Sequence, residues 1–140
     1  VGQAAEAGRV LATALWVEGR GASGAAAGDD PSLAAAVEQE VTWFRGVLAR
    51  TGPASFAAAF DGPARAVRAA TRLAAFAAQS GRALTIGLHT GECELTSGVV
   101  RGPAVETARG LAACAPPGKV LVSRTVTDLV AGAGLAFEAA

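Results

Sequence analysis

The chain has 140 residues, 51% of them hydrophobic and 17% charged, and its twelve basic side chains balance twelve acidic ones. These values predict one domain with a packed core rather than a disordered chain, and they argue against a protein that holds nucleic acid by a basic surface. We expect no membrane segment and a cytoplasmic location, because no apolar run reaches the length of a membrane span and the start does not resemble a signal peptide.

The start of the chain and its cysteines add two expectations. Residues 1–9 predict a lead-in to a single domain over 10–140, and the absence of methionine predicts a piece of a longer protein. Cys93 and Cys114 are too few for a disulfide framework and lack the spacing of metal ligands.

The first half of the chain alternates apolar runs with helix-starting residues. We predict, in order, a strand over 10–17, a loop over 18–28, a helix from Pro31 to near Thr51, a strand over 55–60 and a helix over 63–80. Asp29 and Asp30 precede Pro31 as an acidic helix cap, and Gly81 closes the second helix. The first helix carries an apolar stripe of Leu33, Val37, Val41, Phe44 and Leu48.

The second half predicts shorter elements. These are a strand over 84–89, a second strand or hairpin arm over 92–95 after an interruption at Gly91, a helix from Gly102-Pro103 to about Ala115, a strand over 119–123, a helix over 124–130 and a strand fragment over 135–137. The order favours an α+β fold: a mixed or antiparallel sheet with helices packed on one face, around a ferredoxin-like split βαβ core.

Several separated stretches resemble the class III adenylate/guanylate cyclase homology domain of bacteria. They are RVLATALWVEG at 9–19, FDGPARAVRAA at 60–70, IGLHTGECEL at 86–95, GPAV at 102–105 and PPGKVLVSRTVTDLVAGAGLAFE at 116–138. The resemblance covers nearly the whole chain and implies the same α+β nucleotidyl cyclase core. It also implies conversion of ATP or GTP into a 3′,5′-cyclic nucleotide and pyrophosphate, by a head-to-tail homodimer with its active sites at the interface.

The metal-binding positions that the resemblance implies are altered. The chemistry needs two divalent ions held by two carboxylates. The first position falls at Glu18, where the family has Asp, and the second at Ala54. Asp61 follows seven residues later at the other end of a strand, so it is interpreted as a helix cap instead.

The other implied site positions are altered as well. The two purine-reading positions fall at Arg50, where the family has Lys, and at Pro103. The ribose-orienting Asn falls at Glu106, whose charge would repel phosphate, and the transition-state Arg falls at Gly110. Arg109 is adjacent, but one residue along a helix turns a side chain by about 100°.

These changes predict a catalytically inactive cyclase-like domain that acts as a regulatory or dimerisation module, with a signalling or transcriptional partner. They fall in both halves of each composite site, so an intact partner chain could not complete one. No cofactor is expected, and Mg or Mn would be needed only if nucleotide binding remains. Two alternatives stay open: a small-molecule sensor with a reshaped cleft, and a divergent, weakly active cyclase.

Other chemistry-bearing residues are interpreted as structural. His89, the only histidine, lies on the strand face opposite the apolar residues, without a motif partner. Cys93 is predicted in the core and Cys114 packed late in a helix, whereas Trp16 and Trp43 are predicted to be packing or interface residues. A solvated helix face is predicted for Arg65, Arg68 and Arg72.

Overall fold

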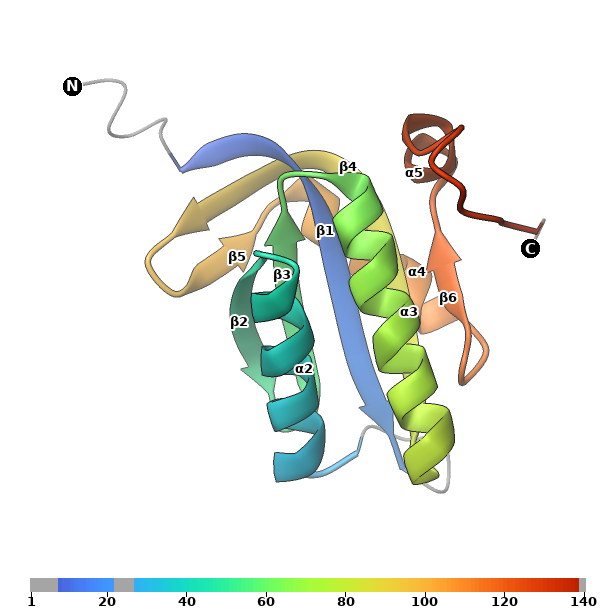
Figure 1. The fold of residues 1–140 in the computed structure, drawn as a ribbon. Coiled ribbons are helices and arrows are strands. Elements are labelled where there is room, and N and C mark those ends of the chain that lie inside the picture. The colour runs from blue at the N-terminus through green and yellow to red at the C-terminus, as the bar shows by residue number, and fades with distance from the viewer. Residues whose placement is uncertain (1–7, 22–26, 139–140) are drawn as a thin grey trace.

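A computed structural model describes residues 8–21 and 27–138 (Figure 1). The predicted lead-in over 1–9 therefore lies mostly outside the described residues. The elements are β1 (Arg9–Arg20), α2 (Pro31–Trp43), β2 (Val47–Gly52), β3 (Ser55–Phe60), α3 (Pro63–Ser80), β4 (Ala83–Thr96), β5 (Val99–Arg101), α4 (Pro103–Cys114), β6 (Val120–Val122) and α5 (Arg124–Leu129).

The strands form one mixed sheet, which confirms the predicted fold class. Its order is β2-β3-β1-β4-β5, with antiparallel neighbours, and β6 pairs with β4 in parallel. The first half of β4 pairs with β6 and its end pairs with β5, while β1 pairs with β4 along twelve residues from Arg9 to Arg20.

The helices cover both faces of the sheet, so the prediction that they pack on one face is wrong. Leu15 and Val17 of β1 pack with α2 and α3 on one side, whereas Ala14 and Trp16 pack with α4 on the other. Figure 1 shows α2 and α3 in front of the sheet and α4 behind it. The reason is that β1 is apolar on both faces, and each face needs its own cover.

Local signals placed two elements at their predicted bounds. β3 and α3 run over 55–60 and 63–80 as expected, and Gly81 takes a left-handed conformation with φ 70° at the end of α3. Asp30 caps α2, since its Oδ1 accepts a hydrogen bond from the Leu33 backbone N–H at 3.2 Å. The elements α4, β6 and α5 also occur within one or two residues of their predicted positions.

The end of α2 is a correction. The helix ends at Trp43 rather than near Thr51, and Leu48 lies in the edge strand β2. Arg45 takes φ 63°, a left-handed conformation that a helix cannot continue through, and Gly46 follows it. The helical spacing of apolar residues continues past this point in the sequence, although the helix itself ends.

Three smaller differences concern the strands. β1 extends to Arg20 into the predicted loop, whose residues 22–26 lie outside the described part. β4 is continuous to Thr96, because Gly91 pairs with Ala12 instead of interrupting the strand. Residues 135–137 are not a strand, since Gly132 and Gly134 at φ 85° and 80° turn the chain just before them. Within the described residues, no helix is long and apolar enough to span a membrane.

Candidate functional site

A hollow of about 380 Å³, called here the Trp16 pocket, lies where β1, the β2–β3 turn, β5 and the start of α4 meet. Three of the residues at the implied site positions line it: Glu18, Ala54 and Glu106. Trp16 and Arg109 line it too, so residues up to 93 positions apart in the sequence share one cavity. Antiparallel pairing of β1 with β3 accounts for part of this, since it puts Glu18 opposite Ser55.

The Glu18 carboxylate is already engaged on both oxygens. Its Oε1 accepts a hydrogen bond from the Trp16 indole Nε1 at 3.0 Å, and its Oε2 lies 3.1 Å from Nη1 of Arg20. The side chain is 22% exposed. A metal ion at Glu18 would therefore have to displace a cation and an N–H donor that the chain itself supplies.

Ala54 lies beside Glu18 and contributes only a methyl group. Its side chain is 4% exposed, and its carbonyl accepts a hydrogen bond from the Gly19 backbone N–H at 2.8 Å. The fold thus brings the two implied metal positions together, but one of them has no oxygen ligand. Hard divalent cations need several oxygen donors, so the residues present do not fit a two-metal centre. No group of three or more His, Cys, Asp and Glu side chains suited to a metal occurs over the described ranges.

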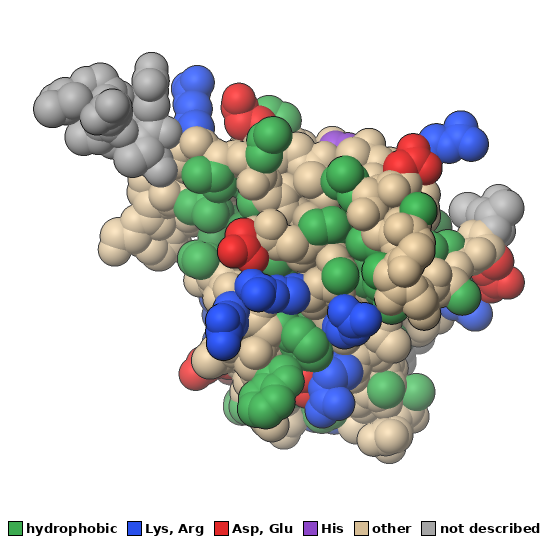
Figure 2. Space-filling model, turned by 45° about the horizontal axis from the view of Figure 1, so that its top comes forward, with side chains coloured by type: hydrophobic (Ala, Val, Ile, Leu, Met, Phe, Trp, Pro, Cys, Tyr) green, Lys and Arg blue, Asp and Glu red, His purple; other side chains and the backbone are tan. Residues whose placement is uncertain are grey.

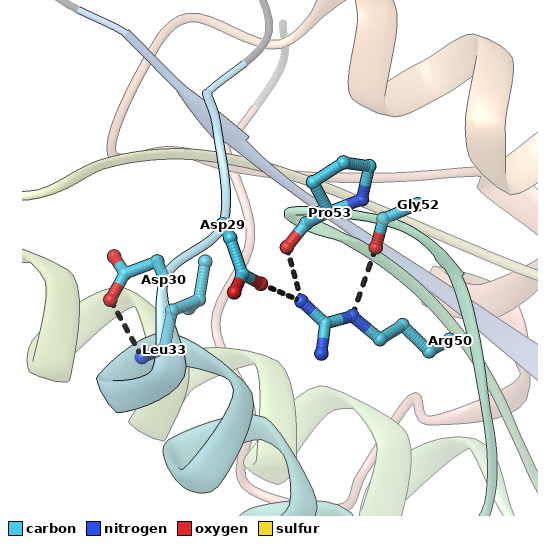
Figure 3. A network of polar contacts seen from close by, with 6 residues as sticks. All are labelled: Asp29, Asp30, Leu33, Arg50, Gly52 and Pro53. Atoms are coloured by element: carbon cyan, nitrogen blue, oxygen red, sulfur yellow. Dashed lines mark hydrogen bonds and ion pairs between the residues drawn. The ribbon is translucent and has the colours of Figure 1, made fainter.

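Arg50 is used within its own hairpin (Figure 3). Its Nε donates to the Gly52 carbonyl at 3.0 Å, and its Nη2 donates to the Pro53 carbonyl at 2.6 Å and to the Asp29 carboxylate. The guanidinium also lies 5.6 Å from the centroid of the Phe56 ring. These contacts link the β2–β3 turn to the start of α2, and Arg50 is not among the residues that line the Trp16 pocket.

Of the implied site positions on α4, Glu106 lines the Trp16 pocket, whereas Pro103 and Gly110 lie outside it. Pro103, the first residue of α4, lines a separate hollow with Glu92 and Arg101. A side chain at Gly110 would point into open space, because a Cβ there would meet no atom within 4 Å. Neither residue lines the Trp16 pocket.

Arg109 is the α4 cation that reaches the pocket, which the sequence reasoning missed. Its guanidinium carbon lies 5.4 Å from the centroid of the Trp16 ring, and its Nη1 lies 3.8 Å from Oε1 of Glu106. Although Arg109 is offset by one residue from Gly110, its side chain still reaches the pocket, because it shares a helix face with Glu106 three residues earlier. That i,i+3 spacing is the signal in the sequence that could have indicated it.

The histidine, the two cysteines and the two tryptophans were predicted to be structural, and the structure confirms this for some of them. The prediction that His89 is structural remains untested, although its Nδ1 lies 2.7 Å from Oγ of Ser123, the cap of α5. Cys93 is in the core as predicted, and burial raises the pKa of its thiol. Cys114 is exposed instead of packed, because α4 turns its alanines toward the sheet. Trp16 is a packing residue, but Trp43 is 76% exposed and packs little in this chain.

The arginines of α3 lie on a solvated face as predicted. Arg65 and Arg72 form ion pairs with Asp61 and Glu40, at 2.9 Å and 2.7 Å, and Arg68 is exposed between them. On the face drawn in Figure 2, Lys and Arg side chains lie next to Asp, Glu and hydrophobic side chains, rather than in an unbroken basic surface.

Comparison with known proteins supports the fold. No protein family model matches the chain, and no curated protein matches it either. A crystal structure of an adenylate/guanylate cyclase/hydrolase from Silicibacter pomeroyi matches with a TM-score of 0.71 and 21% identity, over 88% of this chain and 81% of that one. The adenylyl cyclase CyaB from P. aeruginosa matches with a TM-score of 0.68 and 14% identity, over 88% and 81%.

A third match is a noncanonical dimeric form of the guanylyl cyclase domain of the RhoGC fusion protein, from the aquatic fungus Blastocladiella emersonii. Its TM-score is 0.73 at 14% identity, over 88% of this chain and 85% of that one. The three structures share a fold with this chain. Their sequence identities are too low to assign the roles of their residues to residues of this chain. The chain therefore has the fold of the class III adenylate/guanylate cyclase catalytic domain.

Proposed function

We propose that this chain is a cyclase-fold domain that does not cyclise nucleotides and acts as a regulatory or dimerisation module in signalling. One observation carries the proposal: Ala54 presents a buried methyl group beside Glu18, where the resemblance implies the second metal carboxylate. Two divalent ions cannot be held by one carboxylate that already binds Arg20 and Trp16.

The charges around the cleft support the same proposal. Glu106 places a carboxylate where a nucleotide's phosphates would need cations, and the Nε and Nη2 donors of Arg50 are used by Asp29 and by the hairpin. Of the two arginines that line the Trp16 pocket, Arg101 is paired with Glu94, and Arg109 stays available to an anion. One such cation does not replace two metal ions in stabilising the charge that develops during phosphoryl chemistry.

Calorimetric titration with ATP and with GTP, each with Mn²⁺, tests the proposal first. We expect no saturable heat at millimolar nucleotide and no cyclic nucleotide in a product assay. Formation of cyclic nucleotide in proportion to the protein, abolished by Glu18→Ala, would overturn the proposal in favour of a divergent cyclase. Saturable nucleotide binding without product would contradict the proposed regulatory module and would indicate a nucleotide sensor instead.

The proposal extends to assembly and location. We infer a homodimer, which the dimeric form among the structures of the same fold supports. We also propose the head-to-tail arrangement that the resemblance implies, and a signalling or transcriptional partner. The free thiols of Cys93 and Cys114 suit the reducing cytoplasm. Light scattering during size-exclusion chromatography tests the dimer, and a monomer at high concentration would contradict it.

A second candidate function is favoured by the pocket itself. Its volume of about 380 Å³ lies within the range of small-molecule sites, and Trp16, Ala54 and Val105 make much of its lining apolar. A sensor of a small molecule would use the cleft without metal ions.

A further inference from the structure

Two arginines line the Trp16 pocket, Arg101 and Arg109, and Arg101 is paired through its Nε with Glu94. Arg109 lies over the Trp16 ring at 5.4 Å, which holds the guanidinium by its face. Its nearest carboxylate oxygen, on Glu106, is 3.8 Å away and beyond hydrogen-bond distance. Within the described part of the chain, no hydrogen bond engages Arg109, and its side chain is 60% exposed. The N–H edge of this guanidinium is therefore available to an anion.

Part of the pocket lining is apolar, beside the polar side chains of Glu18, Thr51, Ser55, Arg101 and Glu106. Trp16 is 7% exposed, and Ala54, Val100 and Val105 are similarly buried, so each shows only a small apolar surface to the cavity. The acidic Glu18 adds little repulsion, because Arg20 and the Trp16 N–H engage both of its oxygens. The pocket thus combines an apolar part, which includes the Trp16 ring, with the planar guanidinium of Arg109.

We propose that the Trp16 pocket binds a small organic carboxylate with a flat apolar body, whose carboxylate is held by Arg109. The body contacts Trp16, Ala54 and Val105, and the carboxylate accepts hydrogen bonds from the guanidinium in the paired geometry that Arg favours. This ligand class deepens the sensor function proposed above and rests on it, because a nucleotide with its metal ions would occupy the same space.

Glu106 competes with such a ligand. Its carboxylate lies close enough to attract Arg109 without a hydrogen bond, and it repels an incoming anion. Removal of its charge by Glu106→Gln should tighten carboxylate binding several-fold. A ligand that carried an ammonium group would show the opposite response, because Glu106 would attract it.

Fluorescence of Trp16 measures this binding directly. The chain has two tryptophans, and Trp43 is exposed, so a Trp43→Phe variant leaves Trp16 as the only indole without disturbing the core. The probe is 3-phenylpropionate, compared with 3-phenylpropanol, acetate and L-phenylalanine. These lack the charge, lack the body and add an ammonium group, respectively. Calorimetry on the unsubstituted chain confirms each affinity.

We expect a saturable change in Trp16 emission with 3-phenylpropionate, and no saturation with acetate. Binding of 3-phenylpropanol should be weaker by about tenfold or more, the change expected when a hydrogen bond between charged groups is lost. Arg109→Gln should weaken the binding of 3-phenylpropionate by the same factor. Arg109→Lys should weaken it less, because lysine keeps the charge although it cannot stack on the Trp16 ring as a planar group. Far-ultraviolet circular dichroism verifies that each variant folds.

Three results would overturn the inference: no saturable change with 3-phenylpropionate, equal affinities for the acid and the alcohol, or tighter binding of L-phenylalanine that weakens in Glu106→Gln. The titrations contain no nucleotide, so they stand apart from the cyclase assay. Cyclic nucleotide formation would overturn the proposed function, whereas failed carboxylate binding without cyclisation would overturn this ligand class alone.

Discussion

Asp30 has two tasks at the start of α2. One oxygen caps the helix by accepting from the Leu33 N–H, and the carboxylate as a whole receives two hydrogen bonds from Arg82, at 2.7 Å and 3.1 Å. Arg82 in turn stacks on Phe76 at 5.2 Å. One side chain thus joins the start of α2 to the end of α3, while Arg50 and Asp29 join the same helix to the β2–β3 turn.

Substitution of Asp30 separates these two tasks. The hydrogen bond from Arg82 lowers the pKa of Asp30 below its ordinary value of 3.8. The ion pair therefore stabilises the fold fully above pH 3.8, and this stabilisation is lost as the pH falls through the lowered pKa. Asp30→Asn keeps a good helix cap but removes the charge, so we expect a loss of about 1 kcal/mol at neutral pH that shrinks toward zero in acid.

Urea unfolding of both proteins, at neutral pH and well below pH 3.8, measures this difference. Arg82→Gln is the matched control, since it should cost a similar amount at neutral pH. The double variant should then cost little more than either single one. A difference between the native chain and Asp30→Asn that is the same at both pH values would exclude the ion pair as its cause.

At the scale of elements, the close approach of α4 to β4 builds the second layer. A Cβ at Gly87 would collide with the Ala108 carbonyl oxygen and lie 2.6 Å from the Ala112 backbone nitrogen. The facing residues of α4 are alanines, so the helix backbone rests almost directly on the strand. This contact also places Val105, Glu106 and Arg109 at the Trp16 pocket.

Gly87→Ala should therefore push α4 away from the sheet. We expect a loss of about 3 kcal/mol or more in the free energy of unfolding, because two backbones would have to separate to admit one methyl group. Gly110→Ala on the same helix is the control: a Cβ there meets open space, and alanine should stabilise the helix by about 1 kcal/mol. Chemical unfolding monitored by circular dichroism measures both, and equal effects would contradict the close approach.

For the molecule as a whole, two apolar layers enclose the sheet and make the two thiols unequal. Cys93 is buried in the layer between the sheet and α4, where burial raises the pKa of its thiol. Cys114 is exposed at the end of α4. Thiol reagents react with the exposed thiolate, so the two residues report on different states of the protein.

We expect one thiol per chain to react rapidly in the native state and the second to react only as fast as the α4 layer opens. A chromogenic disulfide reagent measures both rates. Cys114→Ser should abolish the fast phase, and adding denaturant should accelerate the slow one. Rapid reaction of both thiols in the native protein would mean that the α4 layer does not close over Cys93.

Local signals explain which elements were predictable. Pro63 and Gly81 bound α3 through their own backbone preferences, so no distant contact is needed to place its ends. The end of α2 was mispredicted because Phe44 and Leu48 continue the helical spacing from within a turn and a strand. Gly91 was misread as an interruption, whereas it is a small residue where β4 passes close to Ala104 of α4.

The candidate site was predictable only in part. The resemblance indicated that Glu18 and Ala54 would be near each other and that Ala54 would lack a metal-binding oxygen. It gave no reason to place Arg109 on Trp16, nor to expect Arg50 to be taken up by its own hairpin. Those outcomes depend on side-chain length, helix rotation and competing partners, which no local pattern contains.

The amino-acid sequence by itself determined the α+β class, the position of α3 and the change of a carboxylate to a methyl at Ala54, because these follow from local backbone preference and residue identity. Tertiary structure alone decided that helices cover both faces of the sheet, that Glu18 is held by Arg20, and that Arg109 overlies Trp16. The physical reason is that each of these needs a distant partner or a layer on the far side of the sheet, and such contacts exist only once the chain has packed.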